Sequence, residues 1–140
     1  MLRTKLIEIA LEWQEKFGIA PQITTPLSEY DAAMLVGMPQ EEYSAFMQDK
    51  TAVMKGSDFI YNNIRYQVKG NRPSGKPGSK ITMVPKAANY DWDKLIWVMY
   101  DKNYVIQEAW LWNVEDYQKA FDHIKRLSPD HYRAGECLYV

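Results

Sequence analysis

Residues 57–70, SDFIYNNIRYQVKG, have the pattern of two β-strands joined by a tight turn at Asn62-Asn63. Adjacent Asn residues tolerate the positive φ angles of a two-residue turn, and β-forming residues flank them on both sides. With these two residues as the turn, counting outward places Asp58 opposite Gln67. Because side chains alternate along a strand, Asp58, Gln67 and Lys69 share one face. The hairpin is therefore expected to hold a carboxylate, an amide and an ammonium group together on a polar surface.

The other face of this hairpin is apolar, and it carries Phe59, Tyr61, Ile64, Tyr66 and Val68. The same count pairs Phe59 with Tyr66 and Tyr61 with Ile64. One apolar face and one polar face are typical of antiparallel strands with a core on one side only. We therefore expect this apolar face to lie on the core and the face of Asp58 to carry any chemistry.

The length of 140 residues suits one domain with a single substantial core. A hydrophobic fraction of 46%, with 14% aromatic residues, favours a folded globule over a disordered chain. No apolar run is as long as a membrane span, and the first residues match no signal peptide. Cys137 is the only cysteine, so no disulfide can form within the chain. We expect a single domain over residues 1–140, located in the cytoplasm without membrane attachment.

Basic residues are concentrated in one segment, although the net charge is only −1. Residues 64–86 contain six of the 17 Lys and Arg residues and no acidic residue: Arg65, Lys69, Arg72, Lys76, Lys80 and Lys86. The rest of the chain holds 11 basic and 18 acidic residues. A local positive segment on an acidic body suits a polyanion that binds in one place. A solvated loop without a partner explains the charge pattern equally well.

Residues 3–17 predict an amphipathic helix that ends at Gly18. Its charged side chains gather on one side. Its apolar residues recur at intervals of three or four and form one stripe, which consists of Leu6, Ile9, Ala10, Trp13 and Phe17. Because a surface helix of a globular protein buries its apolar side, we expect this stripe to pack on the core.

A second helix is predicted over residues 29–36, with Ser28 as its N-cap. Asp31 stands three positions after Ser28, in the place of the capping-box residue. The small pair Ala32-Ala33 would allow this helix to approach a sheet closely. Glu29 lies in the first turn, where a carboxylate complements the helix dipole. A functional role for Glu29 depends on where the helix docks, which periodicity leaves open.

The remaining segments predict an α/β (α+β) fold. They are a short helix from Pro39, strands over residues 81–84, 94–100 and 104–112, a helix from the N-cap Asn113 to Leu127, and a tail that is irregular or one short strand. The nearly continuous apolar run at 94–100 indicates a central strand buried on both faces. We expect a mixed sheet of four to five strands flanked by helices.

The sequence argues against three common functional sites: a P-loop, a hydrolase triad and a zinc site. Residues 70–76, GNRPSGK, match the opening of a phosphate-binding P-loop, but Pro77 stands where a Ser or Thr should bind Mg²⁺. His123 and His131 have no nucleophile elbow before them, so a Ser-His-Asp or Cys-His hydrolase is unsupported. One Cys and two His residues cannot build a standard zinc site. Both histidines are expected at the surface.

Aromatic residues offer another way to bind nucleic acid, by stacking on bases. The strands predicted at 94–100 and 104–112 carry five candidates: Trp97, Tyr100, Tyr104, Trp110 and Trp112. Their spacing along strands favours core packing. Trp92, between two aspartates in a loop, is the one that we leave open for base contact.

The polar face of the hairpin resembles the active site of the PD-(D/E)xK nuclease superfamily, which has the restriction-endonuclease-like fold. In that family a strand Asp and the Glu or Gln of the next strand hold a divalent metal. A Lys two residues further on helps to position or activate the attacking water. Asp58 followed by Gln67-Val68-Lys69 resembles this motif as a Gln-x-Lys variant. A Glu from an upstream helix often completes the site, a role that would fall to Glu29, and the order of elements over residues 28–127 is similar to the family's core.

The resemblance implies a metal-dependent nuclease that acts on DNA. Mg²⁺ or Mn²⁺ would be held by Asp58, Glu29 and the side-chain oxygen of Gln67, with Lys69 beside the attacking water. Gln67 stands where the commoner form has an acid, and its neutral amide would weaken Mg²⁺ binding and cannot act as a base. Four basic residues would contact the DNA backbone: Arg65, Arg72, Lys76 and Lys80.

Two other functions remain open. The first is a catalytically silent protein of the nuclease fold that binds nucleic acid or acts as an accessory protein. Its affinity for DNA would depend on salt and be indifferent to EDTA. The second is a protein-interaction module that uses its aromatic surface and does not bind DNA. The oligomeric state stays open, with a homodimer among the alternatives.

Overall fold

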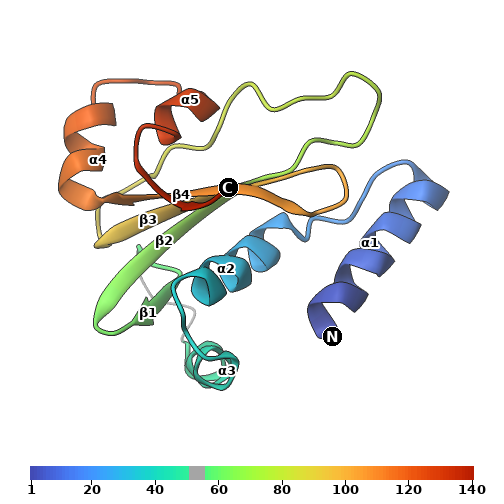
Figure 1. The fold of residues 1–140 in the computed structure, drawn as a ribbon, viewed down its shortest axis with the longest axis horizontal. Helices are drawn as coiled ribbons and strands as arrows, with labels where there is room; N and C mark the ends of the chain where they lie inside the picture. The colour runs from blue at the N-terminus through green and yellow to red at the C-terminus, as the bar shows by residue number, and fades with distance from the viewer. Residues whose placement is uncertain (51–55) are drawn as a thin grey trace.

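The computed structural model describes residues 1–50 and 56–140, and a five-stranded mixed sheet forms the centre of this described part (Figure 1). Strand order in the sheet follows the chain, β1-β2-β3-β4-β5. The elements are α1 Leu2–Phe17, α2 Thr24–Leu35, α3 Gln40–Asp49, β1 Phe59–Tyr61, β2 Ile64–Asn71, β3 Lys94–Tyr100, β4 Ile106–Asn113, α4 Val114–Phe121, α5 Pro129–Tyr132 and β5 Glu136–Tyr139. The predicted fold class is confirmed. None of the helices described is long and apolar enough to cross a membrane.

β1 and β2 form the predicted hairpin in the predicted register. Phe59 pairs with Tyr66, and the turn residues Asn62 and Asn63 have φ angles of 52° and 64°. β2 then runs parallel to β3, whereas the other neighbouring strands are antiparallel. A parallel pair needs a long crossover, and residues 72–93 supply it. The basic segment of the chain therefore leads out of β2 into a connection that passes over the sheet.

The crossover contains no strand at residues 81–84, contrary to the prediction. Val84 forms only an isolated bridge with Leu127. The last predicted helix is also shorter than expected, because α4 ends at Phe121 and Leu127 pairs with Val84 instead. The N-cap of α4 is correct, since the side chain of Asn113 accepts a hydrogen bond from the backbone of this helix. The tail does contain one short strand, β5.

α2 begins at Thr24, so Ser28 lies inside the helix and is not its N-cap, contrary to the prediction. The Ser28 hydroxyl donates to a backbone carbonyl one turn back. Asp31 is no capping residue either. Its buried carboxylate accepts hydrogen bonds from Arg3 at 2.6 and 2.8 Å and from the hydroxyl of Tyr100 at 2.6 Å. Capping rules consider only neighbours in the chain, and both partners of Asp31 are distant in it.

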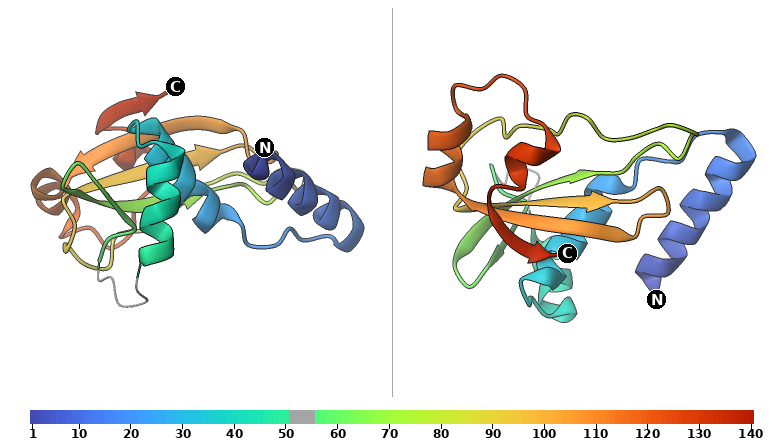
Figure 2. Two further views of the ribbon diagram at one scale, coloured as in Figure 1. Left: turned by 90° about the horizontal axis from the view of Figure 1, so that it is seen from below. Right: turned by 45° about the horizontal axis from the view of Figure 1, so that its top comes forward.

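The sheet has a core on each of its faces. Figure 2 shows α2 on one face, and Figure 1 places α4 and α5 on the other. On the α2 side, Ala32 and Ala33 are fully buried, as their size predicts. The α4 side is filled mainly by large aromatic residues, namely Trp92, Trp97, Trp112, Tyr117, Phe121 and Tyr132. β3 is buried on both faces as predicted, with 0% exposure from Leu95 to Val98.

Trp92 belongs to this aromatic core. Only 1% of its surface is exposed, and its indole N–H donates to the backbone oxygen of Asn89 at 2.7 Å. Trp97 is fully buried as well, and its N–H donates to the side chain of Asn71 at 2.9 Å. Because buried indole groups with satisfied N–H donors cannot stack on a base, the core interpretation holds for Trp97, and Trp92, which the sequence left open for base contact, is a core residue as well.

α1 forms as predicted and ends at Gly18 with a φ of 87°, but it buries a different face. Of the predicted apolar stripe only Ala10 is buried, while Ile9, Trp13 and Phe17 are each more than half exposed. Two other apolar residues, Ile7 and Leu11, pack against the core instead. The prediction of which side of α1 faces the core was therefore wrong.

Polar contacts at both ends set this rotation of α1. Near its N-terminus, Arg3 forms the ion pair with the buried carboxylate of Asp31. Near its C-terminus, Gln14 accepts a hydrogen bond from Arg72 at 2.7 Å and donates to the backbone oxygen of Ser74 at 2.9 Å. The face of α1 that carries Arg3 and Gln14 must turn inward, which leaves the other apolar residues outside.

α2 and β2 approach each other closely at one point. A Cβ atom added to Gly70 would stand 2.7 Å from both Cβ and Oγ of Ser28. Glycine is therefore required here by the approach of the helix, without a left-handed backbone conformation. Glu29 follows Ser28 directly, so the same contact fixes where Glu29 lies relative to β2.

We expect Gly70→Ala to destabilise the protein by about 1–3 kcal/mol, because the added methyl group forces α2 away from β2. Ser28→Gly removes the atoms that this methyl group meets, so the double variant should lose less than the sum of the two single losses. Urea unfolding of the wild type, both single variants and the double variant measures this coupling. Strict additivity, or a Gly70→Ala protein as stable as the wild type, would contradict the tight contact.

Candidate functional site

Asp58 stands immediately before β1, where the hairpin ladder ends. Its backbone N–H donates to the carbonyl of Tyr66 at 2.7 Å. Its carboxylate oxygen Oδ2 accepts from the backbone N–H of Val68 at 2.8 Å and from Nε2 of Gln67 at 3.2 Å. The carboxylate thus takes the place of a strand partner for β2. The predicted juxtaposition of Asp58 and Gln67 is present, and a backbone donor fixes the orientation of the carboxylate.

α2 brings Glu29 to the same carboxylate. Burial is the main cause that raises the pKa of Glu29 from its ordinary value to about 7. The negative charge of Asp58 and a hydrogen bond between the two carboxyl groups act in the same direction, while Lys50 opposes them. Near neutral pH the Glu29 carboxyl is therefore protonated in only part of the molecules. Paired carboxyl groups with a raised pKa are a common feature of functional sites.

The structure adds Lys50 and Tyr43 to this cluster, and no pattern in the sequence indicated either residue. The Lys50 ammonium donates to the backbone oxygen of Asp58 at 2.9 Å. The pKa of the Tyr43 hydroxyl is raised to about 12, first by burial and then by the charges of Glu29 and Asp58. Both residues come from the region of α3, which no motif connects with the hairpin. Only the docking of α3 beside β1 reveals them.

Lys69 lies two residues beyond Gln67 on β2, with the buried Val68 between them. Alternation places Gln67 and Lys69 on one side of the strand, about 7 Å apart along it. Within the described ranges, no hydrogen bond or ion pair joins the ammonium of Lys69 to Glu29, Asp58 or Gln67. The structure thus brings Glu29, Asp58 and Gln67 together. Lys69 lies on the same strand as Gln67 but, among the residues described, makes no polar contact with the other three.

Two of the predicted DNA-contacting residues are engaged within the protein. Arg65 forms an exposed ion pair with Asp93 at 3.1 Å. Arg72 stacks over the ring of Tyr104 at 4.3 Å and donates to Gln14 and to the backbone oxygen of Lys102. Arg72 therefore fastens the crossover to α1 and to the β3–β4 turn.

Lys76 and Lys80 are different, because both lie exposed on the crossover that leaves β2. Lys86, further along, donates to the backbone oxygens of Asp122 and Ile124 and is part of the packing. The six basic residues of the predicted positive segment thus have separate roles, and Lys76 and Lys80 are the ones most accessible to a polyanion.

The oxygen donors of the site are the carboxylates of Glu29 and Asp58 and the amide oxygen of Gln67. In the described ranges, no group of three or more His, Cys, Asp or Glu side chains could hold a metal ion. The histidines lie elsewhere: His123 is exposed, and Nδ1 of His131 accepts the backbone N–H of Ser128 at 2.8 Å. His131 is half-buried and caps α5, which corrects its predicted surface position.

A scan against models of known protein families finds none that matches this chain, and a search of curated proteins finds no match either. The resemblance to the PD-(D/E)xK superfamily therefore rests on the residues of this chain alone. What the site can do must be argued from its own geometry and charge.

Glu29 should make the stability of the metal-free protein depend on pH. Its folded-state pKa of about 7 lies above the ordinary value of 4.5, so its favourable contribution is complete below the ordinary value and is lost as the pH rises through 7. Glu29→Gln cannot ionise and should avoid this loss. The wild type is therefore expected to fall a few degrees in Tm relative to Glu29→Gln between about pH 5 and about pH 8.

Thermal unfolding in EDTA measures this difference. Glu15→Gln, on the exposed side of α1, is the matched control, and its Tm should follow that of the wild type at each pH. Parallel pH profiles for the wild type and Glu29→Gln would show that Glu29 is not held against Asp58.

Proposed function

We propose that this protein is a metal-dependent nuclease that hydrolyses phosphodiester bonds in DNA. The observation that carries the proposal is the pair Glu29–Asp58, in which two carboxyl groups are held together and the pKa of one is raised to about 7. No ion pair among the described residues joins either carboxylate, and the ammonium of Lys50, which bonds to the backbone oxygen of Asp58, offsets only part of their charge. A divalent cation would relieve this repulsion, and it would lie beside Gln67 and the strand that carries Lys69.

The donor set fits Mg²⁺ or Mn²⁺. Mg²⁺ prefers oxygen ligands and is usually bound by one or two carboxylates together with water and substrate phosphate. Asp58 and Glu29 would supply the carboxylates, and Gln67 would supply an amide oxygen. When bound, such an ion supplies Lewis-acid activation of water and neutralises charge at the scissile phosphate.

Asp58, Gln67 and Lys69 would each have a different role in the proposed site. The Val68 N–H fixes one oxygen of Asp58, so the carboxylate keeps its orientation while the other oxygen is available. Gln67 directs its amide nitrogen at Asp58, and a half-turn of the amide would present its oxygen instead. Lys69 would orient the attacking water and contact the phosphate as a cation.

DNA contacts would follow from the crossover. Lys76 and Lys80 are exposed and come directly after the strand of Lys69, so they would contact backbone phosphates on one side of the site. Arg65 and Arg72 remain in the proposed contact surface. Arg65 shares its charge with Asp93, and Arg72 positions the segment that carries Lys76.

A catalytically silent nucleic-acid-binding protein is the second candidate, and Lys50 is the observation that favours it. The ammonium of Lys50 lowers the pKa of Glu29 and so supplies part of the positive charge that the carboxylate pair needs. With Lys50 in this role and a neutral Gln67 in place of an acid, the site would keep its shape without a metal ion.

Cleavage of plasmid and short single-stranded DNA, with Mg²⁺ and with Mn²⁺, tests the nuclease. We expect the wild type to cut with either ion and EDTA to stop it. Asp58→Ala and Lys69→Ala should each lower the rate by on the order of 10²-fold or more while DNA binding persists. Lys119→Ala, on the exposed side of α4, is the control and should cut like the wild type.

The other outcomes separate the two candidates. DNA binding that is indifferent to EDTA, without any cutting, would favour the silent protein. Its affinity should fall with rising salt, and the slope should become shallower by about one unit in Lys76→Ala and in Lys80→Ala. Full cutting activity in Asp58→Ala or Lys69→Ala would overturn the proposed site.

A further inference from the structure

α1 presents a continuous apolar face to the outside of the protein. Its residues recur every three or four positions, and their exposed fractions are 78% for Leu2, 36% for Leu6, 60% for Ile9, 52% for Trp13 and 59% for Phe17. Scattered single apolar residues are normal on a surface, but a stripe along a whole helix marks an interaction surface. α1 packs on its own body through Ile7, Ala10 and Leu11, so it has two apolar sides and the body covers only one.

The exposed side of α1 is held in a fixed orientation. Arg3 is bound to the buried carboxylate of Asp31, and Gln14 is bound to Arg72 and Ser74, at opposite ends of the helix. Rotating α1 to bury the outer stripe would break both sets of contacts. The stripe is therefore a preformed surface, and a partner must cover it if it is to be covered at all.

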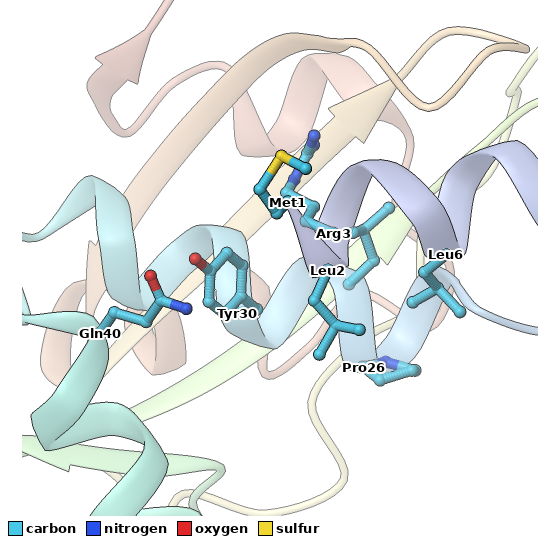
Figure 3. A pocket seen from close by; sticks show the side chains of 8 residues that line it. Met1, Leu2, Arg3, Leu6, Pro26, Tyr30 and Gln40 are labelled. Atoms are coloured by element: carbon cyan, nitrogen blue, oxygen red, sulfur yellow. The ribbon is translucent and has the colours of Figure 1, made fainter.

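Two halves of this surface have complementary shapes. At the N-terminal half, a cavity of about 190 Å³ opens among Met1, Leu2, Leu6, Pro26, Leu27 and Tyr30 (Figure 3). At the C-terminal half, the rings of Trp13 and Phe17 lie 4.7 Å apart and stand out from the helix. One half is a hollow lined mainly by apolar residues, with Arg3 and Gln40 also in its lining, and the other is an aromatic projection.

We propose that two copies of this chain form a symmetric dimer through antiparallel packing of α1 against α1. A two-fold axis passing near Ile9, midway along the stripe, would place Trp13 and Phe17 of each copy over the cavity of the other. The cavity and the projection are about 16 Å apart along the helix, since eleven residues at 1.5 Å each separate Leu2 from Trp13. Such an interface is isologous, because each copy supplies both the hollow and the projection.

Charges beside the stripe agree with the antiparallel arrangement. Lys5 and Glu12 are both exposed and border the stripe on the same side, seven residues apart. Antiparallel packing about Ile9 brings Lys5 near Glu12 of the second copy, and the symmetry makes this pair twice. Parallel packing about a two-fold axis along the helices would place Lys5 of one copy and Glu12 of the other on opposite flanks of the interface, so this pair would not form. Lys16, further along, lies over the ring of Phe17 at 5.8 Å.

Sedimentation equilibrium of the full chain over a wide concentration range tests the dimer. We expect a reversible dimer for the wild type and a Kd raised by roughly 30-fold or more in Trp13→Glu, because a buried Trp at an interface is a typical energetic centre. Thr4→Glu adds the same charge to the opposite, polar side of α1 and should leave the dimer intact. Circular dichroism verifies that both variants fold.

Two further experiments test the direction of packing. Lys5→Glu should weaken the dimer, and Lys5→Glu combined with Glu12→Lys should restore it. In a Cys137→Ala background, Ile9→Cys should form a disulfide between the two copies on mild oxidation, whereas Leu2→Cys should not, because antiparallel packing sets the two ends of the stripe apart. A wild-type protein that stays monomeric at high micromolar concentration would overturn the proposal. So would a dimer that persists unchanged in Trp13→Glu.

Discussion

The close contact between α2 and β2 at Gly70 and Ser28 is the constraint on which the site depends. A Cβ atom on residue 70 would not fit between the strand and Ser28 of the helix. Ala32 and Ala33, one turn further along α2, continue the same close packing on the sheet. Because Glu29 follows Ser28 directly, a small displacement of the helix would move its carboxyl group away from the hairpin. A packing requirement in the core therefore determines how close Glu29 lies to Asp58 in the proposed site.

The site also depends on the shortness of β1, which leaves a backbone donor of β2 unpaired by a strand. β1 ends its pairing at Phe59, so the next donor of β2, the N–H of Val68, is free to bind a side chain. Asp58 supplies that side chain and is thereby oriented by the backbone. Burial and the charge of Asp58 then raise the pKa of Glu29, and Lys50 offsets part of that effect. Local strand geometry and electrostatics thus converge at one edge of the sheet.

The local features of the fold were predictable from the sequence. The Asn62-Asn63 turn fixes the hairpin register, and from it the contact of Asp58 with Gln67. The apolar run of β3 likewise indicates a strand buried on both faces. These predictions succeed because they depend on neighbours in the chain or on simple alternation.

Local signals misplaced the start of α2 and the end of α4, and the other predictions that failed depend on tertiary packing. The hydrophobic pattern of α1 fits burial of the stripe that includes Trp13, but the pairing of Arg3 with Asp31 turns another side inward. The proximity of Lys50 to Asp58 follows from the docking of α3, and no periodicity reports it. Glu29 could be proposed for the site only through a family resemblance, whereas its pKa and its contact with Asp58 require the folded structure.

A crystal structure of the protein soaked in Mn²⁺, with anomalous scattering measured for the metal, tests the central claim most directly. We expect one anomalous peak between the carboxylates of Asp58 and Glu29, at about 2.0–2.3 Å from their oxygens. The amide of Gln67 should turn its oxygen toward the metal. A structure in which Lys50 occupies the space between the two carboxylates, with no anomalous peak beside them, would contradict the assignment of a metal-dependent nuclease.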